Sequence, residues 1–372
     1  MRVLFDLTSL AHNFSGIERY ALCVSQELIR QYPQNRYILV FKNAIHDAFR
    51  ILEEQGNVTC VVLRGGNKLL FNQIRLPLAL YRIKADTYFF LAFPEPILFF
   101  KKNMNTAIHD AVCWDCAKTM PILKRLYFRM SYRKSMAFCR QIITVSEFSK
   151  ARLISIGHIP SDRIVVAHSG ISSGFSSAAD DRAEVLEKYQ LPTNYILTLS
   201  TLEPRKNLPL LLEAYEKALL KADLPDLVLV GRMGWMMEKY FSNLSDEIKQ
   251  RVRFTGFVVD EDLPAIYRQA SFFVFPSKYE GFGLPPLEAM ACGTPVLSSD
   301  AASMPEILGN AAVYFHSEDA CDLANKLRQI VSLPQEEYSQ LVARGIQRAN
   351  FFSWGKSASI LAELISESCR GK

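Results

Sequence analysis

The chain has 372 residues, of which 49% are hydrophobic and 22% charged, and its formal net charge is +5. This composition excludes a disordered or collagen-like protein, and the length favours two domains over one. The first ten residues have too short an apolar run for a signal peptide, and the most hydrophobic stretch, 88–100, is broken by prolines and too short to span a bilayer.

Short strand patterns alternate with helical patterns through the first half of the chain. Residues 3–7 form the first predicted strand, and a helix is predicted after Gly16. One face of that helix is apolar, with Ile17, Tyr20, Ala21, Val24 and Leu28. Further strands are predicted at 37–41, 59–63, 87–91, 106–109, 142–145 and 164–167.

The segment 117–140 is strongly basic. It holds seven Lys and Arg and no acidic residue, interleaved with Leu123, Leu126, Tyr127, Met130 and Phe138. Residues 1–175 carry 23 basic and 12 acidic residues, a net charge of +11, so the remainder carries −6. Two interpretations stand: a basic helix lying on an anionic membrane, or a core helix with one solvated face. No nucleic-acid-binding motif accompanies the charge, so nucleic acid is not expected as a partner.

The second half repeats the alternation. A strand is predicted at 195–200, and a helix opens near Asn207 with Leu208, Leu211, Leu212, Tyr215 and Leu219 on one face. Strands are predicted at 227–230, 253–256, 272–275 and 295–298, and a linker rich in Ser, Gly, Ala and Asp at 169–191. Strand–helix alternation predicts an α/β fold with two doubly wound parallel-sheet domains. Ligands of such sheets bind beyond the carboxyl ends of the strands, so we expect the two domains to face a cleft.

The most informative segment is 277–293, which reads SKYEGFGLPPLEAMACG. It predicts a glycine-rich turn after a strand, then a helix that starts at the two prolines and ends at Gly293. Exposed N–H groups and the positive helix dipole make such a turn an anion site. Two carboxylates flank it, Glu280 before the turn and Glu288 in the predicted first helical turn. An ordinary strand–helix turn is the plainer reading, and a dinucleotide fingerprint is excluded because Pro286 stands at the third glycine position.

The string EGFGLPPLE, followed by AMACGTPV, resembles the Glu-x7-Glu signature of the large retaining glycosyltransferase family 4, of GT-B fold. The resemblance extends to the segments 201–207 (TLEPRKN), 230–235 (VGRMGW), 145–149 and 108–110. It implies that residues 1–175 form an acceptor-binding domain and residues 176–351 a donor-binding domain, both Rossmann-like. It also implies that a helix at 352–372 packs back on the first domain. Where relatives carry Asn-Gly before the linker, this chain has Ser169-Gly170.

The resemblance also implies roles for single residues. Arg205 and Lys206 would neutralise the donor diphosphate in place of a metal ion, and Glu280 would contact the transferred sugar while Glu288 binds the ribose hydroxyls. The remaining donor-binding residues implied are Gly16, Gly231, Gly281, Phe282, Gly283 and Leu284. For the cation pair the plain alternative is a solvated helix start, but a basic pair there would oppose the helix dipole.

His109, at the end of a predicted strand, resembles the family histidine that lies against the transferred sugar. On its own, a buried histidine bonded to the main chain would be the better interpretation. The other histidines show no metal-like spacing. Cys113 and Cys116 form a CxxC without a second pair, and the eight cysteines read as reduced cytosolic thiols. Neither a metal nor a cofactor is expected.

The function expected from the resemblance is retaining transfer of a hexose from a nucleotide-diphosphate sugar. Mannose from GDP-mannose is the first candidate, followed by rhamnose from dTDP-rhamnose and UDP-linked hexoses. The expected acceptor is a polyprenyl-diphosphate-linked glycan in bacterial O-antigen, capsule or exopolysaccharide synthesis. The expected location is cytoplasmic and peripheral on the inner face of the membrane, reached through the basic first half. A GT-B-fold sugar-nucleotide isomerase or phosphorylase and a non-catalytic sensor are the alternatives from other classes.

Overall fold

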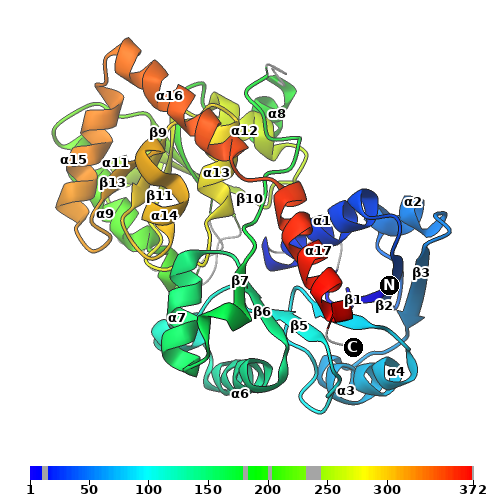
Figure 1. Ribbon diagram of the computed structural model, residues 1–372. Coiled ribbons are helices and arrows are strands. Elements are labelled where there is room, and N and C mark those ends of the chain that lie inside the picture. Colours follow the sequence, from blue (N-terminus) through cyan, green and yellow to red (C-terminus); the bar gives the residue numbers. More distant parts are fainter. Residues whose placement is uncertain (11–15, 179–182, 200–202, 232–243, 371–372) are drawn as a thin grey trace. The chain divides into compact units, whose positions relative to one another are not determined.

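The computed structural model describes residues 1–10, 16–178, 183–199, 203–231 and 244–370. The chain divides into two compact units: unit 1 comprises Met1–Gly170 and Ser353–Lys372, and unit 2 comprises Ile171–Phe352 (Figure 1). The chain therefore passes between the units at 170–171 and 352–353, where the sequence indicated 175–176 and 351–352.

Within the described residues, unit 1 contains a parallel sheet of seven strands in the order β3–β2–β1–β4–β5–β6–β7. The strands are β1 (Arg2–Asp6), β2 (Arg36–Lys42), β3 (Val58–Leu63), β4 (Thr87–Phe90), β5 (Met104–Ala107), β6 (Gln141–Thr144) and β7 (Ile164–Val166). Val3 pairs with Tyr37 on one side and with Thr87 on the other. The strand order thus reverses at β1, which makes the gap between β1 and β4 the topological switch point of this sheet.

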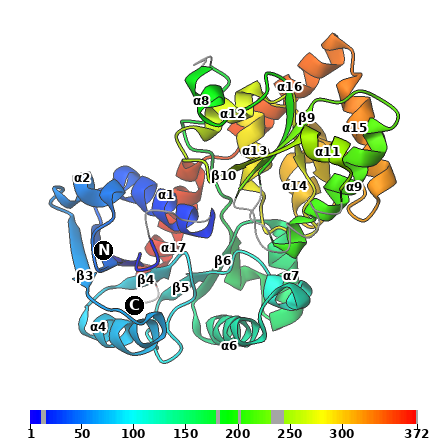
Figure 2. The same cartoon turned by 180° about the vertical axis from the view of Figure 1, so that it is seen from behind.

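Helices connect these strands, and the C-terminal helix of the chain adds to them. They are α1 (Gly16–Gln31), α2 (Arg50–Glu53), α3 (Lys68–Leu70), the π-helical turn η2 (Phe71–Arg75), α4 (Leu76–Arg82), α5 (Val112–Asp115), α6 (Ile122–Phe138), α7 (Glu147–Gly157) and α17 (Trp354–Arg370). The last of them packs along α1, although more than 320 residues separate the two in sequence (Figures 1 and 2). Its Ala358, Leu361 and Ile365 follow helical spacing and are buried.

Within the described residues, unit 2 has a parallel sheet of six strands in the order β10–β9–β8–β11–β12–β13. The strands are β8 (Tyr195–Leu199), β9 (Asp226–Val230), β10 (Val252–Gly256), β11 (Phe272–Phe275), β12 (Val296–Ser299) and β13 (Val313–Phe315). The four inner strands, β8, β9, β11 and β12, are rich in β-branched and aromatic residues and almost wholly buried, as expected for strands covered on both faces. The edge strands β10 and β13 are partly exposed. The switch point of this sheet lies between β8 and β11.

The helices of unit 2 are α8 (Ala183–Lys188), the turn η5 (Pro204–Lys206), α9 (Leu208–Leu219), α11 (Asp246–Arg251), α12 (Leu263–Gln269), α13 (Leu284–Ala291), α14 (Met304–Leu308), α15 (Ala320–Val331) and α16 (Gln335–Asn350). The buried faces of α9 and α15 pack together and, with Leu227, Leu229 and Val274 of the sheet, form one hydrophobic core. Among the described helices of both units, none combines the length and hydrophobicity needed to cross a bilayer.

The predicted α/β class with two doubly wound parallel sheets is confirmed. Three local predictions were wrong. The short strand β13 was missed because three residues are too few to show alternation. The expected linker 169–191 contains α8, whose polar residues resemble loop composition. The strand predicted at 106–109 is Met104–Ala107, and its Asn105 is buried and donates to Thr87 Oγ1 at 2.9 Å.

Candidate functional site

The candidate site in unit 2 is built from two segments that follow neighbouring strands. Arg205 and Lys206 lie in the turn η5, which comes after β8, and Glu280 lies in the loop after β11. These two strands flank the switch point of the sheet. The carboxyl ends of parallel strands meet at one edge, so the topology brings side chains together from positions about 75 residues apart.

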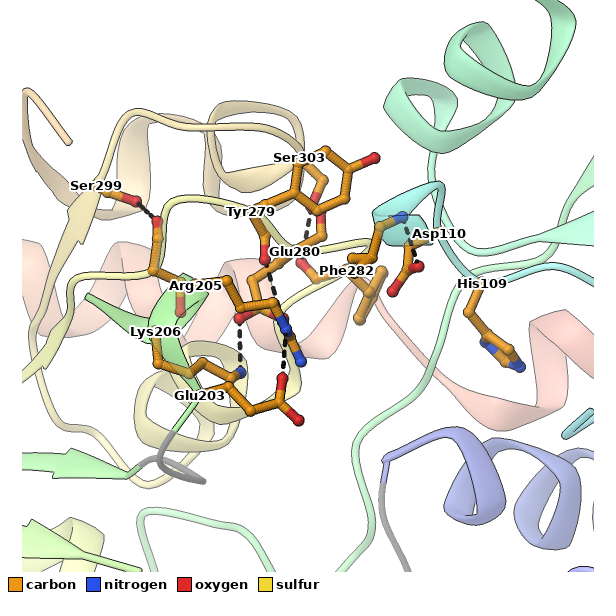
Figure 3. Close-up of polar contacts among 12 residues, drawn as sticks. His109, Asp110, Glu203, Arg205, Lys206, Tyr279, Glu280, Phe282, Ser299 and Ser303 are labelled. Atoms are coloured by element: carbon orange, nitrogen blue, oxygen red, sulfur yellow. Dashed lines mark hydrogen bonds and ion pairs between the residues drawn. The ribbon is translucent and has the colours of Figure 1, made fainter. Parts of the chain in front are cut away.

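Arg205 and Lys206 both form ion pairs with Glu280 (Figure 3). Lys206 Nζ lies 2.6 Å from Glu280 Oε1, and Arg205 Nη1 lies 3.0 Å from Glu280 Oε2. The three side chains are 17%, 11% and 12% exposed, whereas Glu203, which binds Arg205 Nε at 2.7 Å, is 53% exposed. The solvated helix start considered for the cation pair is therefore wrong, because both cations have close partners in a largely buried cluster.

The cluster keeps Glu280 ionised. Burial raises the pKa of this carboxyl, but the charges of Lys206 and Arg205 outweigh that effect, so the pKa lies below its ordinary value. Lys206 Nζ also lies 5.4 Å from the centre of the Phe275 ring. Glu280 is the buried anion that faces the two cations, because Glu203, which also pairs with Arg205, is exposed. The buried part of the cluster therefore has one excess positive charge that a phosphate group can compensate.

The loop between β11 and α13 is fixed by main-chain contacts on both sides. Lys278 donates its backbone N–H to the Arg205 carbonyl at 2.8 Å, and Arg205 Nη1 donates to the Tyr279 carbonyl at 3.1 Å. Ser303 Oγ donates to the Glu280 carbonyl at 2.9 Å (Figure 3). The main chain of the loop that carries Glu280 is therefore held from the segment after β8 and from the segment after β12, which favours a preorganised site.

Gly283 shapes the start of α13. Its φ of 99° is left-handed, and a Cβ added there would lie 2.5 Å from Met304 Cε. The positive φ favours glycine, and any larger residue would also displace the end of the Met304 side chain. Pro285 and Pro286 have no N–H, so Gly283 and Leu284 supply the amide donors nearest to this helix end.

Glu288 is the fifth residue of α13, so it lies in the second helical turn and not in the first turn, where the sequence placed it. It is 5% exposed and accepts a hydrogen bond from Tyr267 Oη at 3.3 Å. Its distance from the helix start weakens the plain interpretation of a carboxylate that only satisfies the helix dipole. The hydrogen bond from Tyr267 joins Glu288 to α12.

The remaining donor-site candidates are distributed over both units. Gly231 directly follows β9, has φ 141° and donates its N–H to the Gly256 carbonyl at 3.0 Å. The rest of its motif, 232–235, lies outside the described residues, as do Thr201 and Leu202. Phe282 is buried, with its ring 5.4 Å from that of Phe352. In unit 1, Gly16 is the exposed first residue of α1.

His109 follows β5 in unit 1 and is buried. Its Nε2 lies 2.8 Å from the Leu91 carbonyl, which can only accept, so Nε2 carries the hydrogen of a neutral ring. Burial lowers the pKa of His109 to about 4, although the bond to Leu91 acts in the opposite direction. The ring stands edge-on to Tyr20 at 5.0 Å. The geometry matches the main-chain-bonded histidine considered as the plain alternative, and it leaves Nδ1 as an acceptor.

The CxxC pair does not form a reactive or metal-binding centre. Cys113 is buried, and burial raises the pKa of its thiol to about 12. Neither Cys113 nor Cys116 forms a disulfide. Among the described residues there is no group of three or more His, Cys, Asp or Glu side chains arranged to hold a metal ion.

Two serines of the site were missed by sequence reasoning. Ser299 ends β12 and donates to the Ser277 carbonyl at 2.5 Å, and Ser303 holds the Glu280 loop as described above. Both are buried. Their position at or after the carboxyl end of β12 could have identified them. This strand neighbours β11, and the carboxyl ends of parallel strands lie at the same edge of the sheet.

Comparison with known proteins assigns the family. Residues 181–348 match the family described as glycosyl transferases group 1. The O-antigen chain mannosyltransferase B of Escherichia coli is 31% identical, and the alignment covers 95% of this chain and 96% of that protein. The O-antigen chain mannosyltransferase RfbU of Salmonella typhimurium is 27% identical over 65% of each chain.

Solved structures share the fold. The Anabaena HepE structure in complex with UDP and glucose superposes with a TM-score of 0.74 at 17% identity, covering 99% of this chain and 100% of that one. The structure of WaaG, a glycosyltransferase involved in lipopolysaccharide biosynthesis, gives a TM-score of 0.72 at 15% identity, with coverage of 98% and 99%. The expected fold class is confirmed by these neighbours. Because the Escherichia coli relative is also alike over nearly the full length of both chains, this chain belongs to the glycosyl transferases group 1 family and is a glycosyltransferase.

Proposed function

We propose that this chain transfers mannose from GDP-mannose to a polyprenyl-diphosphate-linked glycan, with retention of the anomeric configuration and without a metal ion. The observation that carries the proposal is the cluster of Arg205, Lys206 and Glu280 at the switch point of unit 2. Two O-antigen chain mannosyltransferases among the relatives support mannose as the sugar. Their role in O-antigen synthesis supports a lipid-linked acceptor at the inner face of the cytoplasmic membrane.

The cation pair performs the electrostatic part of the proposed reaction. Arg205 and Lys206 bind the donor diphosphate and stabilise the charge that develops on it as the sugar–phosphate bond breaks. Charge-assisted hydrogen bonds from these residues supply what a divalent ion supplies in metal-dependent transferases. The amides of Phe282, Gly283 and Leu284 add donors at the start of α13.

The other site residues act on the sugar and the nucleoside. Glu280 accepts hydrogen bonds from hydroxyls of the transferred sugar and steadies its oxocarbenium-like state, while Glu288 binds the ribose hydroxyls. Gly231 and Gly281 allow the donor to approach the main chain closely. His109 of unit 1 contacts the sugar as a neutral ring, and Gly16 lies beneath the diphosphate.

The proposed chemistry proceeds on one face of the sugar. The bond between the anomeric carbon and the phosphate oxygen breaks while a bond to the acceptor hydroxyl forms, and the leaving diphosphate takes the acceptor proton. Neither glutamate is assigned as a nucleophile, since both bind the donor. The two-carboxylate mechanism of glycosidases therefore does not apply.

Thermal unfolding with GDP, UDP, dTDP and ADP tests the donor site. A nucleotide at about 100 times its Kd stabilises a protein by about 2.7 kcal/mol. We expect GDP to raise the Tm, with the same shift in EDTA because no metal takes part. Stabilisation by UDP or dTDP alone would overturn GDP-mannose as the donor, and a shift abolished by EDTA would overturn metal independence.

Glu280→Gln tests the assigned role of this carboxylate. The variant keeps the shape but loses the charge that pairs with both cations, so we expect kcat/KM to fall by about 10²–10³-fold. Intact-protein mass spectrometry should show no sugar bound to the enzyme during turnover. Glu213→Gln is the matched control, because its ion pair with Lys217 is on the surface. A trapped glycosyl-enzyme would refute the same-face mechanism.

A further inference from the structure

The helix α6 of unit 1 is arranged with its apolar side chains outward. Ile122, Leu126 and Met130 recur every four residues and are 61%, 54% and 52% exposed. On the opposite face Ser131 and Ser135 are buried. A helix on the surface of a monomeric protein shows the reverse pattern, with its apolar stripe toward the core. This helix therefore presents an apolar row that folding of unit 1 leaves uncovered.

The buried face of α6 is held by an ion pair. Lys134 Nζ lies 2.9 Å from Glu95 Oε1 and donates to the carbonyls of Pro96 and Phe99. Ser135 Oγ donates to the other oxygen of Glu95 at 2.9 Å. These contacts fix the rotation of the helix about its axis. The outward direction of the apolar row is thus set by a buried polar cluster.

A second exposed apolar row runs along the segment α3–η2–α4. Leu70, Ile74 and Leu78 again recur every four residues, and all three are exposed, as is Tyr81. Gln73 joins the two rows, because its Nε2 donates to Tyr127 Oη of α6 at 3.1 Å. The two helical segments lie side by side at the bottom of unit 1 in both views (Figures 1 and 2).

The loop 97–101 fills the space between the two rows. Tyr81 Oη donates to the Leu98 carbonyl at 3.2 Å, and the Phe100 ring stands edge-on to Phe138 of α6 at 5.2 Å. Leu98 and Phe100 are themselves exposed. We call the whole surface the apolar face; its members are Leu69, Leu70, Ile74, Leu78, Tyr81, Leu98, Phe100, Ile122, Leu123, Leu126, Met130 and Phe138.

The helical segments that carry the two apolar rows have exposed charges of one sign. Residues 57–85 and 117–140 contain no Asp or Glu. Of the seven basic residues at 117–140, Lys134 is buried and Arg125 and Arg129 donate to main-chain carbonyls. The exposed cations on the segments that form the face are Arg75, Arg82, Lys84, Lys102, Lys118, Lys124 and Arg133.

We propose that the apolar face docks on an anionic lipid bilayer, with the two apolar rows inserted among the acyl chains near the headgroups. Parallel apolar rows flanked by Lys and Arg are the pattern of an interfacial membrane surface, and each cation near an anionic leaflet strengthens binding about fivefold. A protein partner would have to supply a large apolar patch ringed by acidic groups. Docking would bring unit 1 to a lipid-linked acceptor in the membrane that holds its lipid. This purpose of docking rests on the proposed function.

Sedimentation of the full chain with vesicles tests the proposal. We expect it to bind vesicles of phosphatidylcholine with 30% phosphatidylglycerol at least tenfold more tightly than vesicles of phosphatidylcholine alone. Leu126→Gln/Met130→Gln and Ile74→Gln/Leu78→Gln should each weaken binding at least tenfold, because each removes two inserted side chains from one row. Leu220→Gln/Val331→Gln, two exposed apolar residues of unit 2, is the matched control and should bind as the wild type does.

Two further measurements separate the alternatives. Sedimentation velocity of the free protein shows whether a second copy covers the apolar face. A wild-type dimer that is monomeric in both row variants would overturn the proposal. Vesicle binding by the row variants as tight as that of the wild type would also overturn it. Nucleotide stabilisation of the row variants should equal that of the wild type. If the wild type binds vesicles but no nucleotide stabilises it, the proposed donor site is wrong and the docking surface stands. If a nucleotide stabilises it but it does not bind vesicles, the docking surface is wrong and the donor site stands.

Discussion

Replacing both Arg205 and Lys206 with alanine should lower kcat/KM by about 10⁴-fold and abolish stabilisation by the nucleotide. Each cation is aimed at the charge that develops on the leaving diphosphate, and loss of one preorganised donor costs about 10²–10³-fold. The two residues share one ligand and one buried partner, Glu280, so their effects should not be fully additive. Initial rates with the donor identified by thermal unfolding measure the change.

A control is needed because the double variant also leaves Glu280 without its cations. Burial, which raises the pKa of that carboxyl, is then no longer opposed by the two cations, so the fold of the variant must be checked by thermal unfolding. Lys217→Ala/Arg253→Ala removes the same charge from exposed ion pairs of unit 2 and should change the rate by less than twofold. An equal loss in both variants would show that net charge, and not the cluster, governs donor binding.

The strand pattern was predictable because the buried strands carry dense runs of apolar residues. β11 is Phe-Phe-Val-Phe and was placed at its observed bounds, and most other strands were placed within about two residues. The order of the strands follows from the rules for doubly wound sheets. Strand β13 and helix α8 could not be predicted from periodicity. The strand has three residues and the helix six, several of them polar, and such short segments do not show a repeat.

The site was predictable as a set of segments and not as a set of contacts. The glycine-rich turn identified Glu280, and the TLEPRKN segment identified Arg205 and Lys206, but nothing local indicates that these side chains pair with one another. That pairing comes from the adjacency of β8 and β11, a tertiary property. The same limit applies to α6: its basic composition was visible, yet the outward direction of its apolar row depends on Glu95, which is distant in sequence.

The largest effect on stability is expected for Gly170→Ala. A Cβ on Gly170 would overlap the backbone N of Trp354 and lie 2.6 Å from the carbonyl carbon of Ser353. Both atoms belong to the main chain where α17 begins, so no change of rotamer relieves the overlap and the start of the helix must shift. We expect a loss of about 3 kcal/mol, the upper end of overpacking costs, and a Tm lower by about 6–12 °C.

Gly174→Ala is the matched control for this substitution. It lies four residues further along the chain, it is exposed, and an added Cβ would meet no atom within 4 Å. Its stability should stay within about 0.5 kcal/mol of the wild type. Hydrogen exchange localises the effect: in Gly170→Ala the amides of α17 should exchange faster, since the contact between Trp354 and Tyr20, with ring centres 5.9 Å apart, is weakened. Wild-type exchange in α17 would mean that the close approach of Gly170 does not hold this helix on unit 1, and that its packing against α1 alone is sufficient.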